Sequence, residues 1–587
     1  MAEILHNDLL QYYKRELSYL RGQGADFARR YPKVASRLAL HGSESIDPHT
    51  ERLVEAVAFL AARVHRDLDR EFPQIAAALL DNLCPSLIQP VPSMTVAQFA
   101  LDPSQGKVTA GYRVPRHTIL YASTSGGDQC RFRTAWDTTL WPVSVVAANL
   151  PGDSTLRLTL ECEPGADFSE LEIDSLRLHV HGDWMAAMPL YDLLVSGVAN
   201  VTTQGADGVR HTLGSGAWRE VGYADDEEVL PLPGHAQPAY GMMQEYFAFP
   251  RKFHFFELNR LRGRLGQGTR CDLTLTLDRP QRGLRTVSAD NFRLGCVPAV
   301  NLFPRTSEPI VIDHRHYEYL LSADRQRGAT TEVHSIVSVT ASDPNADRPV
   351  IVPSFAAMGP NRDGGDTTFW ASRREQSLRE NISGSDVFLT FVDQANALKP
   401  PSEPVVYANL LCTNRRLAEQ VPVGARMVVE GVSQSIQVSC LYEPTSQRDP
   451  PLGSETLWRL VSLLTLNHQS LVSGTTGTDQ LREMLMLFAS DSMRDHEQIR
   501  GIRGLEARSI TARIGQDAWR GYCRGTEVVL DYDEEAFVGG SPLLMSAVLA
   551  RFFAMYTSVN SFVRLAVRRG DEVWKQWEPM SGRQQVL

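Results

Sequence analysis

Residues 84–99, which read CPSLIQPVPSMTVAQF, divide the chain into two kinds of structure. Before this stretch, apolar residues recur every three to four positions, which is the period of a helix. After Ser93 they alternate with polar residues, which is the period of a strand. Pro85, Pro90 and Pro92 lack the N–H that a helix interior needs, so the helical pattern ends here. We therefore predict a helical segment over residues 1–94 and β-rich structure after it.

The helical segment is expected to begin with one amphipathic helix. Gly22, Gly24 and the pair Tyr31-Pro32 are expected to weaken or end it. The apolar residues that share its face are Leu5, Leu9, Tyr13, Leu17 and Leu20.

A second helix is predicted to start at Asp47-Pro48, where a cap acceptor precedes a proline at the first helical position. Phe72-Pro73 is expected to separate it from a third, short helix that ends before Cys84-Pro85. The apolar residues of the second helix are Leu53, Val57, Leu60, Ala61, Val64 and Leu68, and those of the third are Ile75, Leu79, Leu80 and Leu83.

The centre of the chain is predicted to be β-rich, in two domains over residues 95–300 and 301–450. Residues 342–370 are rich in turn-forming residues and predict a long surface loop. Three runs alternate strictly and predict half-buried antiparallel strands, namely Leu156-Leu158-Leu160, Leu176-Leu178-Val180 and Leu273-Leu275-Leu277.

Residues 451–587 are predicted to form an α+β domain. Helical spacing returns from Trp458, and a further helix is expected from Ser541. Strands are expected at 526–530, 562–567 and 572–577. The whole chain of 587 residues is too long for one hydrophobic core, so the predicted class is α+β and multidomain.

Composition disfavours several classes of protein. The formal charge of −10 disfavours a nucleic-acid binder, which needs a basic field. The apolar run from Leu543 to Val559 is interrupted by Arg551 and is shorter than the roughly 20 residues of a membrane-spanning helix. The N-terminus has no secretory pattern, and the eight cysteines form no C-x-x-C pair, which indicates the cytoplasm.

Candidate reactive groups are few, and the common nucleotide-binding and hydrolase motifs are absent from the sequence. The pairs His179/His181 and His314/His316 could each offer two imidazoles to a metal, but a tetrahedral site needs three or four ligands. Solvent-facing histidines are the plainer interpretation. No cofactor or metal is therefore predicted.

Three further groups of residues each have a functional interpretation and a purely structural one. The acidic run Asp531, Asp533, Glu534 and Glu535 could bind calcium or act as an acid/base pair, although acidic turns are usually only solvated. Cys412 and His468 could form a nucleophile and base, although a buried free cysteine is commoner. The basic cluster that could dock an acidic partner, or form a solvated helix face, is Arg29, Arg30, Lys33 and Arg37.

A series of motifs resembles the TssF (ImpG/VasA) family of type VI secretion baseplate subunits, from about residue 9 to 567. The N-terminal motifs are YYKRELSYLR at 12–21, DFA at 26–28, YPKVA at 31–35, DPH at 47–49, AFLAAR at 58–63, FP at 72–73 and PVPSM at 90–94. The later ones are CVPAVNLFP at 296–304, LCTNR at 411–415, LNHQSL at 466–471 and VNSF at 559–562. Residues 200–240 and 342–370 show little similarity to it.

The resemblance implies a non-catalytic, phage tail-like wedge protein of a contractile injection system, with no direct membrane insertion. Its implied partners are TssG at two TssF copies to one, a second TssF copy, TssK, TssE, the sheath and the VgrG hub, on a baseplate docked at the inner-membrane complex. Buried aromatic and aliphatic anchors typically carry such contacts. The side chains expected to do so here are Tyr12, Tyr13, Leu17, Tyr19, Leu20 and Phe27.

Two alternatives remain open from sequence. One is a metal-dependent envelope hydrolase that uses His314 and His316 or the acidic run near Asp531. The other is a stand-alone β-rich module whose cleft for carbohydrate or peptide would be lined by Trp136, Trp141 and Trp184. Scattered tryptophans are more often core residues, because large rings are mostly buried.

Overall fold

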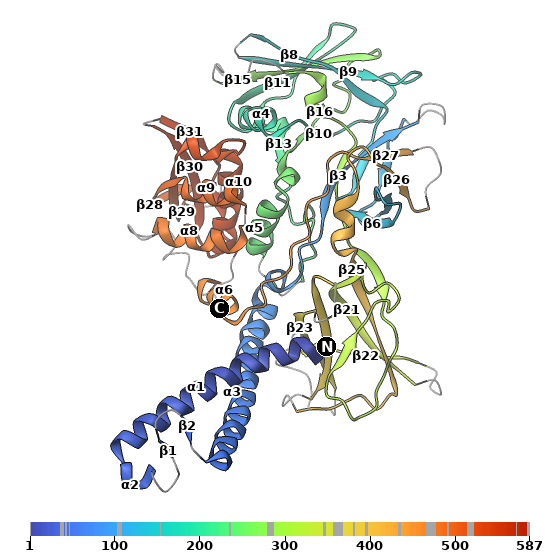
Figure 1. Ribbon diagram of the computed structural model, residues 1–587. Helices are drawn as coiled ribbons and strands as arrows, with labels where there is room; N and C mark the ends of the chain where they lie inside the picture. Colours follow the sequence, from blue (N-terminus) through green and yellow to red (C-terminus); the bar gives the residue numbers. More distant parts are fainter. Residues whose placement is uncertain are drawn as a thin grey trace.

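A computed structural model of the chain is shown in Figure 1. It describes residues 2–583 except 36–39, 42–43, 46, 103–108, 153, 234–235, 237, 279–286, 344–347, 356–367, 378, 380–381, 394–396, 432–435, 465–476, 490–491, 514–521 and 571. The described part has a helical projection, a β-rich body and a C-terminal domain with helices beside a sheet. The predicted α+β, multidomain class is confirmed.

Residues 2–83 form the projection, which we call the arm (Figure 1). It consists of α1 (Ala2–Arg30), α2 (Pro32–Ala35), the short strands β1 (Leu40–His41) and β2 (Glu44–Ser45), and α3 (Pro48–Leu83). Asp47 caps α3, as predicted, by accepting a hydrogen bond from the backbone N–H of His49 at 3.1 Å. The long helices α1 and α3 pack against each other, and α6 (Ser454–Leu464) packs on α3.

Two predicted helix breaks in the arm are wrong. α1 continues through Gly22 and Gly24 to Arg30, and α3 continues through Phe72-Pro73, so the predicted third helix is the end of the second. A glycine costs a helix only about 1 kcal/mol. An internal proline removes one hydrogen bond, and the many remaining bonds of a 36-residue helix, together with its packing on α1 and α6, outweigh that loss.

A closed barrel follows directly after the proline-rich stretch, at the change of period that the sequence showed. Its strand order is β17-β3-β27-β26-β5-β6. The strands are β3 (Met94–Leu101), β5 (Ile119–Ser123), β6 (Gln129–Thr134), β17 (Cys296–Val300), β26 (Arg426–Val429) and β27 (Ile436–Cys440). The barrel thus joins strands from both sides of residue 300, so it is built from distant parts of the chain.

Two sheets with α4 (Trp184–Ser196) and α5 (Pro238–Ala248) lie between β6 and β17 in sequence. Their strand orders are β13-β14-β10-β16 and β12-β11-β15-β9-β8. The strands are β8 (Val143–Gly152), β9 (Thr155–Cys162), β10 (Leu176–Val180), β11 (Val198–Gly205), β12 (Arg210–Thr212), β13 (Trp218–Val221), β14 (Phe255–Leu258), β15 (Arg270–Leu277) and β16 (Phe292–Arg293). The three alternating runs form β9, β10 and β15 in antiparallel pairing, with their leucines buried, as predicted.

Residues 303–413 form a β-sandwich with its own hydrophobic core. One layer contains β18 (Phe303–Thr306), β19 (Ile310–Val311), β21 (Glu332–Ser342), β22 (Val350–Val352) and β25 (Val405–Thr413), and the other β20 (Tyr319–Leu321), β23 (Phe369–Gln376) and β24 (Ser385–Val392). The expected loop at 342–370 is partly wrong, because β22 pairs with β21 there. Residues 344–347 and 356–367 of that stretch lie outside the described residues.

The C-terminal domain contains the predicted strands and helix, and two strands, β28 and β32, that the sequence did not reveal. Ser541 caps α10 (Pro542–Tyr556), which crosses from β29 (Tyr522–Tyr532) to the parallel strand β30 (Phe562–Arg569). β28 (Ile502–Arg513) was missed, because its polar edge position removes the alternation. The remaining elements are α8 (Gly477–Phe488), α9 (Met493–Arg500), β31 (Glu572–Gln576) and β32 (Met580–Ser581).

Candidate assembly interface

Exposed apolar side chains gather on the arm. A soluble chain normally buries such groups, so a concentration of them indicates a surface that another protein covers. The exposed apolar residues of the arm are Leu10, Tyr19, Phe27, Tyr31, Val34, Leu53, Val57, Phe59, Leu60, Val64 and Leu79.

Four of these residues form a continuous stripe along α3. Leu53, Val57, Leu60 and Val64 are 69%, 46%, 59% and 57% exposed. Their spacing of four, three and four residues is the heptad spacing of a helix–helix seam. We call this set the α3 stripe. Since helical spacing places them on one face, they offer a ready seam to another helix.

The opposite face of α3 packs against α1 and carries small residues. Ala58 and Ala62 are fully buried, and their spacing places them on the face that carries Glu51 and His65. Both of those residues bind α1: His65 Nδ1 lies 2.8 Å from Glu16 Oε1, and the Arg21 guanidinium donates to Glu51 Oε1 at 2.5 Å. Small side chains allow the two helices to approach closely, while the large aliphatic ones are left on the outside.

The predicted interface residues of α1 separate into two groups. Tyr19 is 62% exposed and Phe27 is 38% exposed, and the Phe27 ring lies 5.3 Å from that of Tyr31. The half-buried members are Tyr12, Tyr13, Leu17 and Leu20. The α3 stripe was recognised as a helix face but not as an interface, because sequence periodicity cannot tell an inward face from an outward one.

The described residues of the basic cluster at the end of α1 are exposed, which both of its interpretations allow. Arg29 donates to Asp26 one turn earlier, and both side chains are largely exposed. Arg30 and Lys33 are also exposed, and Arg37 lies outside the described residues. A solvated ion pair of this kind contributes little to binding or stability.

The histidine pairs do not assemble a metal site. The solvent-facing interpretation is wrong for His179, which is fully buried on β10, where its Nε2 lies 3.0 Å from the Tyr442 hydroxyl and burial holds its pKa well below the usual value. His181 Nδ1 contacts the carbonyl oxygen of Asp290 at 3.1 Å. His316 Nδ1 contacts Asp313 Oδ2 at 2.7 Å. Within the described ranges, no cluster of three or more His, Cys, Asp or Glu side chains could hold a metal ion.

Two residues of the acidic run, and Cys412, likewise have structural roles. Asp533 accepts from the Glu535 backbone N–H at 3.2 Å and caps a short turn, and Glu534 pairs with Arg569 through two bonds of 2.6 and 2.7 Å. Burial raises the pKa of the Cys412 thiol to about 12, so it stays protonated and unreactive. His468 lies outside the described residues.

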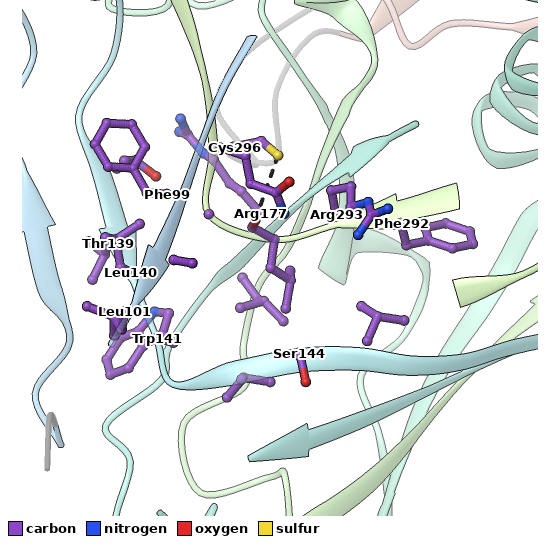
Figure 2. A pocket seen from close by; sticks show the side chains of 18 of the residues that line it. Phe99, Leu101, Thr139, Leu140, Trp141, Ser144, Arg177, Phe292, Arg293 and Cys296 are labelled. Atoms are coloured by element: carbon purple, nitrogen blue, oxygen red, sulfur yellow. Dashed lines mark hydrogen bonds between the residues drawn. The ribbon is translucent and has the colours of Figure 1, made fainter. Parts of the chain in front are cut away.

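The three tryptophans do not line one cleft. Trp136 is buried and its Nε1 donates to the Glu227 carbonyl at 2.6 Å. The guanidinium groups of Arg251 and Arg494 lie over the Trp184 ring, at 4.5 and 4.4 Å from its centre. Only Trp141 borders the cavity of about 360 Å³ between the barrel and the β8–β9 sheet (Figure 2).

Several charged groups that line this cavity pair with one another or with nearby residues. Arg177 donates to Glu257 at 2.9 Å and contacts Glu227 at 3.3 Å, and Arg293 pairs with Asp290 at 3.0 Å. In Figure 2, the labelled side chains around them are mostly apolar or short. The cavity therefore offers no organised set of reactive groups. Among the described residues, no helix is both long enough and apolar enough to span a bilayer.

Comparisons with known proteins give one consistent result. A family profile described as "Type VI secretion system, TssF" matches residues 5–584. The type VI secretion system component TssF1 of Pseudomonas aeruginosa is 33% identical over 612 aligned positions, which cover 98% of each chain.

Two solved structures share the fold. A chain of a type VI secretion TssK-TssF-TssG baseplate subcomplex superposes with a TM-score of 0.73 at 23% identity, covering 91% of this chain and all of that one. A chain of the type VI secretion baseplate complex superposes with a TM-score of 0.57 at 20% identity, covering 98% of this chain and all of that one. At these identities the solved structures support the fold alone.

Proposed function

Because the chain belongs to the TssF family of the type VI secretion system, we propose that it is a structural wedge subunit of the baseplate that works by binding its neighbours. The family match spans nearly all of the chain, so the resemblance seen in the sequence motifs is confirmed. A role without catalysis agrees with the geometry, since hydrogen bonds or ion pairs hold five of the candidate residues, namely His179, His181, His316, Asp533 and Glu534. No contact among the residues that the structure describes favours the hydrolase or the stand-alone module.

The proposed partners are a second copy of the chain, TssG, TssK and TssE, with two copies for each TssG. The structural neighbour with the higher TM-score comes from a TssK-TssF-TssG subcomplex, which supports TssG and TssK as partners. We extend the proposal to the VgrG hub and the sheath, and to a cytoplasmic baseplate docked at the inner-membrane complex. These further contacts follow from the family's role.

The single observation that carries the proposal is the α3 stripe. Fully burying a leucine or valine side chain stabilises a contact by about 1.5–3 kcal/mol. The four residues of the stripe retain roughly half of their surface, so a partner helix could gain about 1 kcal/mol or more from each. We propose that Tyr19 and Phe27 on α1 extend this surface. The half-buried side chains that we expect to contribute their remaining exposed area are Tyr12, Tyr13, Leu17 and Leu20.

We propose that residues 1–94 act as the assembly segment, while residues 95–300, 301–450 and 451–587 form the parts that reach neighbouring subunits. The arm projects from the body in Figure 1, with α2 at its far end. Any activation step would be a rearrangement between discrete packings of these parts.

Co-expression with the cognate TssG and TssK, followed by mass measurement of the purified complex, tests the proposal. The expected mass contains two copies of this chain for each TssG. A photo-reactive amino acid at Leu60 should cross-link to a partner helix in the complex. The same group at Leu398, which is 63% exposed on the sandwich, serves as the matched control. Equal cross-linking at both positions would refute the assignment of the α3 stripe.

A further inference from the structure

Two of the sequence motifs meet at the place where the chain passes between the barrel and the sandwich. The chain enters the sandwich through Asn301, between β17 and β18, and returns through Asn414, after β25. Asn301 Nδ2 donates to Asn414 Oδ1 at 2.9 Å, and the Asn414 backbone N–H donates to Asn301 Oδ1 at 2.7 Å. Both side chains also bind the backbone of Arg131 on β6, at 2.6 and 2.9 Å. The two passages are thus bonded to each other and to the barrel.

Arg415, the next residue, extends from the barrel side into the sandwich. Its backbone has a φ of 51°, a conformation that is strained for a residue with a large side chain. Its guanidinium donates to three sandwich carbonyls: Ser383 at 2.6 Å, Gly328 at 3.2 Å and Thr331 at 3.3 Å. These bonds offset the backbone strain and hold the Arg415 side chain in one position within the sandwich.

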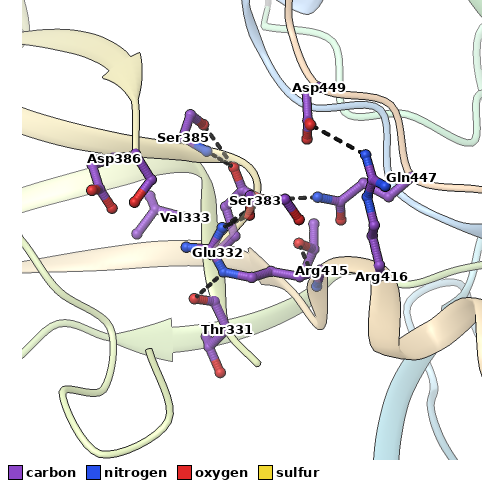
Figure 3. A network of polar contacts seen from close by, with 12 residues as sticks. Thr331, Glu332, Val333, Ser383, Ser385, Asp386, Arg415, Arg416, Gln447 and Asp449 are labelled. Atoms are coloured by element: carbon purple, nitrogen blue, oxygen red, sulfur yellow. Dashed lines mark hydrogen bonds and ion pairs between the residues drawn. The ribbon is translucent and has the colours of Figure 1, made fainter. Parts of the chain in front are cut away.

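Glu332, at the start of β21, lies beside Arg415 and accepts hydrogen bonds there (Figure 3). It is buried and lies 3.4 Å from Arg415, and it also accepts from the Ser385 N–H and hydroxyl at 2.7 and 2.6 Å. A Cβ on the adjacent Gly384 would lie 2.4 Å from Arg415 Nη1 and 2.8 Å from Glu332 Oε2, so only glycine fits there. The site is closed around this ion pair.

A third segment joins the network. Residues 442–453, which we call the strap, run from β27 to α6. Gln447 Nε2 donates to Glu332 Oε2 at 2.7 Å, and its backbone N–H donates to Glu419 Oε1 at 2.9 Å. The next residue, Arg448, exchanges two backbone hydrogen bonds with Val91, at 2.9 and 3.0 Å, in the segment between α3 and the barrel. The sandwich is therefore linked through the strap to the base of the arm.

We propose that Asn301, Glu332, Asn414, Arg415 and Gln447 form a joint that holds the sandwich at one fixed angle to the barrel and the arm. A buried ion pair often gives less net stability than apolar packing of equal volume. We therefore infer that the pair between Arg415 and Glu332 serves to favour one orientation of the sandwich, because its charges are satisfied only in that orientation. The proposal rests on the proposed function in one respect: a scaffold that binds partners through separate parts needs those parts at a set angle. These five residues position the sandwich and need not touch any partner.

Distance measurement between two spin labels on the full chain tests the joint. The labels are placed at Ile351→Cys on the sandwich and Val428→Cys on the barrel, which are 73% and 60% exposed. Cys523 is changed to serine, because it is the partly exposed cysteine, while the other seven are buried. We expect one narrow distance distribution in the otherwise unchanged chain. Arg415→Ala should broaden it about twofold or more, because the change removes the guanidinium bonds to the Ser383, Gly328 and Thr331 carbonyls and so allows the sandwich to sample more angles.

Arg416→Ala is the matched control, since Arg416 is the exposed neighbour whose ion pair with Asp449 spans 3.5 Å. It should leave the distribution unchanged. Gln447→Ala is the milder variant, which should broaden the distribution even if Arg415→Ala fails to fold. Amide exchange in β21 and β25 checks that the sandwich itself stays folded. A folded Gln447→Ala or Arg415→Ala chain whose distribution is as narrow as that of the parent overturns the proposal.

The readout is made on the free chain, so it is independent of partner binding. If the parent chain shows a narrow distribution that the joint variants broaden, but does not bind TssG, the proposed function fails and the joint stands. If TssG binds the parent and the joint variants keep a narrow distribution, the joint fails and the proposed function stands.

Discussion

Truncation of the α3 stripe should weaken assembly while leaving the isolated chain folded. Leu60→Ala removes three carbons, worth about 2.4 kcal/mol if transferred completely from water at about 0.8 kcal/mol per carbon. Because Leu60 is 59% exposed in the free chain, roughly 1.4 kcal/mol of this depends on a partner, or about tenfold in Kd. Leu53 is 69% exposed and lies two turns away, so the two effects should add. The double variant should therefore bind about 100- to 200-fold more weakly.

Titration of the cognate TssG, or of the TssG–TssK complex, against each immobilised variant measures this loss. Leu398→Ala removes the same atoms from an exposed position on the sandwich and should leave Kd unchanged. Thermal unfolding of each free variant shows whether the arm remains intact. Unchanged affinity in a folded double variant, or an equal loss for Leu398→Ala, would refute the reasoning that the stripe is a partner seam.

Three further outcomes follow from the interior of the molecule. Ala62→Leu should force α1 and α3 apart and destabilise the arm by about 1–3 kcal/mol, seen as faster amide exchange in α3. Burial holds the pKa of His254 at about 3, so acidification from pH 7 to 5 protonates only the unfolded state. The free energy of unfolding should fall by about 2 kcal/mol between pH 7 and 5 because of this residue, and His254→Phe should reduce that fall, measured by urea unfolding, by about the same amount. Glu245→Ala should strand the buried charge of Lys252 and cost about 3–5 kcal/mol in urea unfolding, whereas Glu245→Gln, which keeps the side-chain volume and an acceptor oxygen, should cost less.

Local patterns predicted many of the elements of the fold. The alternating leucines of β9, β10 and β15 and the cap at Asp47 were readable because they depend on neighbours two to four residues away. Helix continuity through Gly22 and Pro73 was not readable. There, packing between helices distant in sequence outweighed a local cost of a few kcal/mol.

The candidate interface was only half predictable. Helical periodicity identified the apolar face of α3, but the same pattern fits a face turned to a core or to solvent. The structure turned Ala58 and Ala62 toward α1 and left Leu53 and Leu60 outside. Conversely, the half-buried Leu17 shows that part of the predicted α1 surface is used within the arm.

The sequence alone determined the helical and β-rich parts, the change of period at Ser93, the resemblance to a baseplate family and the absence of common catalytic motifs. These are properties of short windows and of residue order. Only the tertiary structure decided which apolar face stays exposed, and that Asn301 and Asn414, 113 residues apart, exchange hydrogen bonds beside Arg415 and Glu332. The reason is physical: burial and hydrogen bonding between distant residues depend on how the whole chain packs, and no local pattern of residues encodes the packing partner.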